Sequence, residues 1–189
     1  MLVGFFEEGF GAYHLIALTV QGNLEQITAE GRGRRFSETG YEICQTWMRS
    51  AFAEGLGNLG KIRTAIALIG QASEIMERNE ERYFEAEIHR IRGELILKKM
   101  GASTDPSGDI ESAEAAAEQS FREAMVIARR QNARMFELRA AASLGRLLGR
   151  TGKEAEARIL LSGTCDWFTE GFDTPDLAAA RSLLDSFRN

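Results

Sequence analysis

The apolar residues of this chain of 189 residues recur with the period of an α-helix along nearly its whole length. Between residues 61 and 78, for example, they stand mostly three or four positions apart, which places them on one face of an amphipathic helix. The members of this stripe are Ile62, Ala65, Ile66, Ile69, Ala72, Ser73 and Met76. No segment shows a sustained alternation of apolar and polar residues between hairpin turns, so the pattern predicts an all-α fold.

Proline, which breaks helices, is scarce. The chain has only Pro106 and Pro175, where an average usage of about 5% would supply about nine. Both stand between helical stretches. In the segment FDTPDL, Thr174 suits an N-cap, Pro175 suits the first helical position, and Asp176 suits the positive end of a helix. A final helix is therefore expected from residue 174 onward.

Glycine residues mark the ends of the helical stretches, where a positive φ can close a helix. These glycines are Gly22, Gly40, Gly60, Gly101, Gly152 and Gly171. With these boundaries the sequence predicts about nine helices, over residues 2–20, 23–38, 41–58, 61–78, 82–100, 110–131, 134–150, 153–170 and 174–187.

The predicted helices group into pairs that repeat. The glycines that end the first helix of each pair are Gly22, Gly60, Gly101 and Gly152. They recur at steps longer than the about 34 residues of a tetratricopeptide repeat, and a polar loop at 102–110 lengthens the last step. Gly93 and Gly145 occupy the position at which the two helices of a pair approach closely. The sequence predicts a single domain over residues 1–189, an αα-hairpin superhelix that resembles a tetratricopeptide-repeat solenoid.

Charge and hydropathy exclude several classes of protein. The net charge is −5 and the isoelectric point is near 5.3, so the chain lacks the basic surface expected of a nucleic-acid binder. The one basic group, Arg32, Arg34 and Arg35, is interpreted as a solvated helix end. The sequence has no apolar run of 18 residues and no secretory signal, which predicts a cytoplasmic protein with no membrane partner.

Residues that could carry chemistry do not form a complete set. Cys44 and Cys165 are far apart and are interpreted as reduced, apolar core residues. His14 and His89 are the only histidines, so a Ser-His-Asp triad would have to use one of them. Glu85 and His89 are spaced to hold half of a metal site, but an interhelical hydrogen bond or a surface pair is the favoured interpretation. We therefore predict no catalytic residue, no metal and no cofactor.

Two aromatic groups are interpreted as structural. Trp167, Phe168 and Phe172 could bind a ligand, but their position between two predicted helices favours a role in anchoring the last helix. Tyr83 and Phe84 are expected in the core. Neither group is predicted to form a binding site.

A candidate binding surface follows from the repeat alignment, because the first helix of each tetratricopeptide pair lines a groove. The predicted partner-binding residues at these positions are Trp47, Ser50, Glu54, Glu87, Arg90, Glu94, Arg139 and Arg146. Glu54 and Glu94 stand where a carboxylate clamp would need Asn, so that clamp is not supported. Arg139 and Arg146 could hold an acidic segment of a partner, or they could pair within the chain with Glu137 or Glu154.

Three segments resemble a bacterial protein family: ERYFEAEIHRIRGELILKKMG (81–101), SFREAMVIARRQNARMFELRAAASLGRLLGRTGKEAEARILL (120–161) and WFTEGFDTPDLAAARSLLD (167–185). They are similar to the C-terminal helical-repeat region of large proteins in which a class III adenylate/guanylate cyclase domain, or a DNA-binding domain, precedes a central P-loop ATPase. The resemblance is strongest over 81–187.

The resemblance implies a regulatory role without chemistry of its own. The chain contains neither the GxxxxGK[ST] motif of a P-loop nor a recognisable set of cyclase aspartates. It would then be a piece of a longer protein, or a short free-standing relative.

Two functions are expected from different classes. The first is a non-catalytic interaction module that binds a protein or peptide partner, or the ATPase domain of its parent protein. The second is a small-ligand sensor, which requires an enclosed apolar pocket between helices where a scaffold would show an open groove. A homodimer is also plausible, through an apolar patch at Phe5, Phe6 and Phe10.

Overall fold

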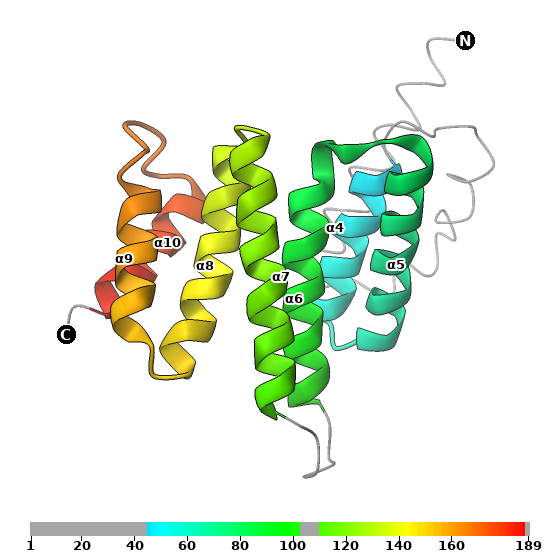
Figure 1. Ribbon diagram of the computed structural model, residues 1–189, viewed down its shortest axis with the longest axis horizontal. Coiled ribbons are helices and arrows are strands. Elements are labelled where there is room, and N and C mark those ends of the chain that lie inside the picture. Colours follow the sequence, from blue (N-terminus) through cyan, green and yellow to red (C-terminus); the bar gives the residue numbers. More distant parts are fainter. Residues whose placement is uncertain (1–44, 103–109, 188–189) are drawn as a thin grey trace. The chain divides into compact units, whose positions relative to one another are not determined.

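All regular secondary structure in the described residues is helical. The computed structural model describes residues 45–102 and 110–187, which contain seven α-helices, one short 3₁₀ helix and no strand (Figure 1). The expected all-α class is therefore confirmed for these residues. The first two predicted helices, 2–20 and 23–38, lie outside them. No helix in the described ranges has the length and apolar character needed to cross a membrane.

The chain divides into two compact units, Met1–Phe84 and Glu85–Asn189. In the N-terminal unit, helices α4 (Gln45–Asn58) and α5 (Ile62–Asn79) form an antiparallel hairpin, followed by the 3₁₀ helix η2 (Arg82–Phe84) (Figure 1). The predicted apolar stripe of α5 is largely buried, since Ala65, Ile69, Ala72 and Met76 lie inside. Ile66 of the predicted stripe is exposed, and Ile75, which was not assigned to the stripe, is buried.

The C-terminal unit holds five helices: α6 (Glu85–Gly101), α7 (Ile110–Arg130), α8 (Arg134–Arg150), α9 (Glu154–Cys165) and α10 (Pro175–Ser186). α6 and α7 pair as one hairpin, α8 and α9 as the next, and α10 packs on both α8 and α9 (Figure 1). α6 also contacts α8, so the first helices of successive hairpins are neighbours. The expectation of one domain over 1–189 stays a prediction.

One continuous apolar core joins the helices of the C-terminal unit. Its large, fully buried members come from α7, α8, α9 and α10, and Ile96 and Leu97 of α6 pack against it. These members are Phe121, Leu138, Leu144, Leu147, Leu148, Leu161 and Leu177. Each hairpin therefore buries its apolar stripe by packing against the next, as expected for stacked helical repeats.

The two hairpins of this unit share a close approach at equivalent glycines. A Cβ atom added to Gly93 of α6 would lie 2.5 Å from Cε1 of Phe121 in α7. A Cβ atom added to Gly145 of α8 would lie 2.9 Å from Cδ1 of Leu161 in α9. In both hairpins a large side chain of the second helix fills the space that the glycine of the first helix leaves, which confirms the close-packing role predicted for these glycines.

The helix ends follow the glycine pattern in part. Gly60 and Gly152 close α4 and α8 with φ of +74° and +76°, as predicted. Gly171 also has a positive φ, +69°, but α9 ends earlier, at Cys165, so the prediction that Gly171 closes this helix was wrong. The prediction for Gly101 was wrong, because it is the last residue of α6 and its φ is not positive. Glu80 and Asn132 take the left-handed conformation after α5 and α7 instead.

The segment after α9 differs from its expected course. The predicted helix 153–170 ends at Cys165, because Phe168 turns back to pack against the core. Pro175 occupies the first turn of α10 as predicted, but the hydroxyl of Thr174 does not cap the helix. It donates a hydrogen bond to the carbonyl oxygen of Gly171 at 2.7 Å and so closes the preceding turn.

Candidate functional site

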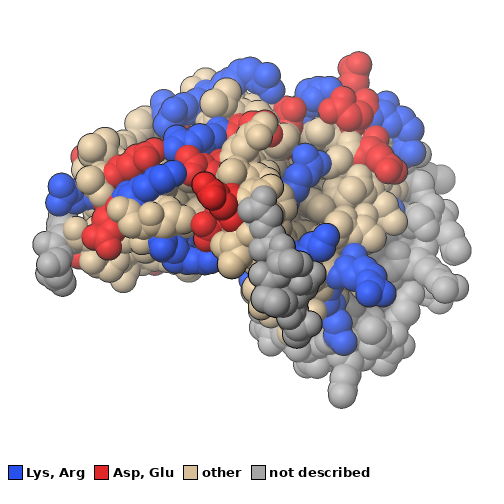
Figure 2. Space-filling model, turned by 60° about the horizontal axis from the view of Figure 1, so that its bottom comes forward, with Lys and Arg blue, Asp and Glu red and all other residues tan. Residues whose placement is uncertain are grey.

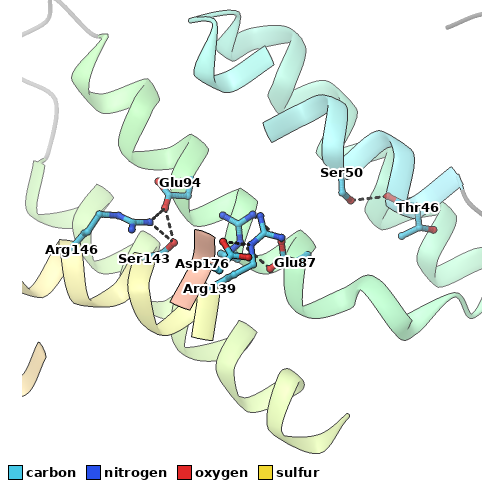
Figure 3. A network of polar contacts seen from close by, with 9 residues as sticks. Thr46, Ser50, Glu87, Glu94, Arg139, Ser143, Arg146 and Asp176 are labelled. Atoms are coloured by element: carbon cyan, nitrogen blue, oxygen red, sulfur yellow. Dashed lines mark hydrogen bonds and ion pairs between the residues drawn. The ribbon is translucent and has the colours of Figure 1, made fainter. Parts of the chain in front are cut away.

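The predicted partner-binding residues of the N-terminal unit lie on α4. The hydroxyl of Ser50 is buried and donates a 2.7 Å hydrogen bond to the carbonyl oxygen of Thr46, one turn earlier (Figure 3). Trp47 and Glu54 are half-buried. Ser50 therefore serves its own helix, and Trp47 and Glu54 keep part of their surface open.

The predicted residues of the C-terminal unit meet in two polar clusters. The first, called the Glu87 cluster, consists of Glu87 and Arg90 from α6, Arg139 from α8 and Asp176 from α10. Arg90 donates two hydrogen bonds to the Glu87 carboxylate, from Nε at 3.0 Å and from an Nη at 2.9 Å. An Nη of Arg139 lies 2.7 Å from the same carboxylate, while Nε of Arg139 lies 3.9 Å from Asp176 (Figure 3).

The Glu87 carboxylate is buried, with 1% of its side chain exposed. A buried charge is costly unless it is paired and hydrogen-bonded, and the two guanidinium groups meet this requirement. Arg90 is almost as buried as Glu87, whereas Arg139 and Asp176 extend to the surface. The cluster thus links α6, α8 and α10 and reaches solvent at one edge.

The second cluster, called the Glu94 cluster, lies two turns along α6 and consists of Glu94, Ser143 and Arg146. The Ser143 hydroxyl donates a 2.7 Å hydrogen bond to Glu94, and Arg146 donates to the same carboxylate oxygen at 3.1 Å (Figure 3). Arg146 also donates to the Ser143 hydroxyl at 3.1 Å. Half of the Arg146 side chain, 52%, remains exposed, so this guanidinium is accessible from outside.

The two clusters join equivalent positions of successive first helices. Glu94 and Arg146 stand 52 residues apart, and Glu87 and Arg139 have the same separation. The intramolecular pairing considered for Arg139 and Arg146 is therefore present, but with Glu87 and Glu94. Glu137 pairs instead with Arg129 at 2.6 Å and with Arg134 at 2.9 Å. The pairing with Glu137 or Glu154 expected from the sequence was therefore wrong, and the contacts with Ser143 and Asp176 were not predicted.

A groove runs along the junction of α6 and α7. Its volume is about 840 Å³. The apolar residues Val126 and Ile127 line it together with charged side chains such as Glu85, Arg122 and Arg130. The groove is open to solvent, since 63% of Val126 is exposed. This shape suits a surface contact better than an enclosed small molecule.

His89 lines the same groove. Its Nδ1 lies 2.9 Å from a carboxylate oxygen of Glu123 in α7. Burial lowers the pKa of His89 below its ordinary value of 6.5, and the charge of Arg92 lowers it further, while Glu123 acts in the opposite direction. His89 is therefore a neutral side chain at neutral pH, and it makes the interhelical contact expected from the sequence.

Reactive and metal-binding groups are not assembled in the described part of the chain. In residues 45–102 and 110–187 no group of three or more His, Cys, Asp and Glu side chains could hold a metal ion. Cys165 is a buried free thiol, and burial raises its pKa, which lowers its reactivity. Cys44 lies outside the described residues.

The aromatic residues after α9 have separate roles. Phe168 packs against the core, whereas Trp167 and Phe172 are exposed. The guanidinium of Arg134 lies 5.0 Å from the ring centre of Trp167, and that of Arg181 in α10 lies 4.1 Å from the ring centre of Phe172. Phe168 and Phe172 therefore tie this segment to the body of the unit. Phe84 is buried as expected, while Tyr83 is exposed.

The charged surface of the C-terminal unit shows no extended area of one sign in the view of Figure 2. Basic and acidic side chains alternate over the described surface at the left of that figure. Between α7 and α9, Arg122 pairs with Glu156 at 2.6 Å and Lys153 pairs with Glu118 at 3.2 Å. Such alternation favours specific, locally matched contacts over long-range attraction of a polyanion.

A scan against protein-family models gives no match for this chain, and a search of curated proteins gives none. What the chain does must therefore follow from its own residues and geometry.

Proposed function

We propose that this chain is a non-catalytic protein–protein interaction and regulatory module built from helical repeats. The observation that carries the proposal is the recurrence of one packing arrangement, in which Gly93 lies against Phe121 and Gly145 lies against Leu161. Repeats stacked in this way present the outer faces of their first helices as one extended surface. For the whole chain the proposed architecture is a tetratricopeptide-like solenoid of about nine helices.

The proposed contact surface is the solvent edge of the two polar clusters. Arg146 is half exposed and shares the Glu94 carboxylate with Ser143, and Arg139 lies beside the exposed Asp176. A carboxylate of a partner could replace or join Glu94 at the Arg146 guanidinium through charge-assisted hydrogen bonds. The partner would therefore be a protein or peptide segment with acidic side chains.

The proposed partner is the P-loop ATPase domain of the protein to which this chain belongs. This part of the proposal rests on the resemblance of residues 81–187 to the C-terminal repeats of bacterial cyclase–ATPase proteins. Such a protein would act in the cytoplasm. Binding of the repeats to the ATPase domain would bias its activity according to a signal received elsewhere.

The alternative is a small-ligand sensor, and the α6–α7 groove is the observation that favours it. Its volume of about 840 Å³ falls within the range of about 300–1,000 Å³ that is typical of ligand pockets. Its open shape counts against it, because such pockets enclose most of their ligand's surface. The interaction module remains the better supported of the two.

A ligand screen separates the two functions. If the chain is an interaction module, no nucleotide or metabolite should stabilise it by binding in the groove, because an open groove with exposed lining residues holds a small molecule weakly. Any rise in melting temperature should therefore be the same in the wild type and in Val126→Arg. Ile159→Arg is the matched control, since Ile159 is exposed on α9 outside the groove. The measurement is thermal unfolding at increasing ligand concentration, together with assays of ATP and GTP turnover, which we expect to be zero.

A ligand that raises the melting temperature of the wild type and of Ile159→Arg to a saturating value, but not that of Val126→Arg, would instead establish the small-ligand sensor. Turnover of either nucleotide by the chain alone would contradict the non-catalytic assignment.

A further inference from the structure

The start of α4 and the end of α5 meet at one end of the N-terminal hairpin. The Thr46 hydroxyl donates a hydrogen bond of 2.5 Å to the carboxylate of Glu81, which holds the two segments together. Arg49 lies about one turn after Thr46, and Arg78 lies about one turn before Glu81. Two arginines from different helices therefore occupy the same end of the hairpin.

Among the described residues, neither of these arginines forms an ion pair with a carboxylate. Glu81 accepts the hydrogen bond from Thr46, and Glu77 pairs with Arg82 at 2.7 Å. Arg78 donates from Nε to the neutral side-chain amide of Asn79 at 3.2 Å. Nε of Arg49 is buried and has no hydrogen-bond partner among the described residues.

This arrangement is unfavourable without an anion. Burial lowers the pKa of Arg49 below its ordinary value, and the like charge of Arg78 lowers it further. A buried N–H group without an acceptor adds to the cost, since buried donors are almost always paired. A bound anion would relieve both the repulsion between the two charges and the unpaired donor.

We propose that Arg49 and Arg78 form a binding site for a phosphate group. Guanidinium groups match the oxygen atoms of phosphate through paired hydrogen bonds, and arginine is the usual residue for such recognition. Two arginines supply two positive charges, which match the charge of about −1.5 to −2 that a phosphate monoester carries at neutral pH. A single carboxylate would neutralise only one of them.

The test compares the melting temperature of the full chain in inorganic phosphate and in chloride at equal ionic strength. Phosphate at several times its dissociation constant should raise the melting temperature of the wild type by about 2–4 °C more than chloride does. Because phosphate also stabilises proteins non-specifically, the comparison needs variants. Arg49→Gln and Arg78→Gln should lose the additional rise in melting temperature that phosphate gives over chloride. Arg63→Gln should keep it, because Arg63 is an exposed residue of α5 outside the proposed site.

Two further measurements sharpen this test. In chloride, Arg78→Gln should leave the melting temperature unchanged or raise it, because it removes the repulsion on Arg49. A purely structural role for Arg78 predicts a decrease.

The same measurement with ATP at equal ionic strength distinguishes a free phosphate ion from the phosphate of a nucleotide as the ligand. Equal effects of ATP and phosphate indicate a free phosphate ion as ligand, and a larger effect of ATP that Arg49→Gln abolishes indicates a nucleotide. Equal phosphate stabilisation of wild type, Arg49→Gln and Arg78→Gln would overturn the proposal.

Discussion

Replacing Glu87 with glutamine is expected to lower the free energy of unfolding of the C-terminal unit by about 3–5 kcal/mol, the usual effect of removing one partner from a buried ion pair. The Glu87 carboxylate is 1% exposed and accepts two hydrogen bonds from Arg90. Without this negative charge, the buried guanidinium of Arg90 loses the carboxylate that accepts its two hydrogen bonds, and Arg139 loses its contact at 2.7 Å. Urea unfolding followed by circular dichroism measures the loss.

Two comparisons show whether burial of the charge is the cause. Glu156→Gln removes one carboxylate from a half-exposed pair with Arg122 and should change the free energy of unfolding by no more than about 0.5 kcal/mol. The double variant Glu87→Leu/Arg90→Leu should be more stable than Glu87→Gln, because no unpaired charge remains at Arg90. A loss of similar size in Glu87→Gln and Glu156→Gln would show that the Glu87 cluster is not the buried link described here.

Replacing Gly93 with alanine is expected to lower the free energy of unfolding by about 2 kcal/mol, although alanine favours a helix over glycine by about 1 kcal/mol. The added Cβ would lie 2.5 Å and 2.9 Å from two ring atoms of Phe121. This ring is fully buried in the core, so it can move only by displacing its neighbours. The measurement is again urea unfolding.

Gly163→Ala provides a control in the same unit. A Cβ atom at Gly163 in α9 meets nothing within 4 Å, so this variant should be more stable than the wild type by about 0.5–1 kcal/mol. Phe121→Leu introduced into Gly93→Ala should recover part of the loss, because the smaller side chain leaves room for the methyl group. If Gly93→Ala were as stabilising as Gly163→Ala, the close approach of α6 and α7 would not exist.

Most of the helix positions in the described residues could be predicted from local sequence. The period of apolar residues located α5, α7 and α8 to within a few residues, because an amphipathic face is a local property of the chain. The end of α9 could not be predicted in this way. It depends on Phe168 packing against a core assembled from other helices, which local pattern does not reveal. The same holds for the exposure of Ile66.

Most members of the polar clusters were selected from the sequence as candidate partner-binding residues, but their pairing with one another was not predicted. Repeat alignment selected Glu87, Glu94, Arg139 and Arg146 because they occupy equivalent positions on successive first helices. Each glutamate has an arginine 52 residues later in the sequence, and neighbouring repeats place equivalent positions side by side. This spacing of opposite charges could have predicted the ion pairs between α6 and α8. Asp176 gave no such signal, because its contact with Arg139 depends on how α10 packs against α8.

The central claim is that this chain binds a protein partner through the solvent edge of its polar clusters. The most direct test titrates the chain into the proposed partner, a P-loop ATPase domain of a longer protein that contains these repeats, with binding followed by calorimetry and ATP hydrolysis by phosphate release. The wild type should bind and change the hydrolysis rate. Arg146→Gln should weaken binding about tenfold or more, the effect of losing a charge-assisted hydrogen bond. Arg150→Gln, an equally exposed arginine one turn further along α8, should bind like the wild type. Absence of binding by the wild type, or equal binding by both variants, would contradict the claim.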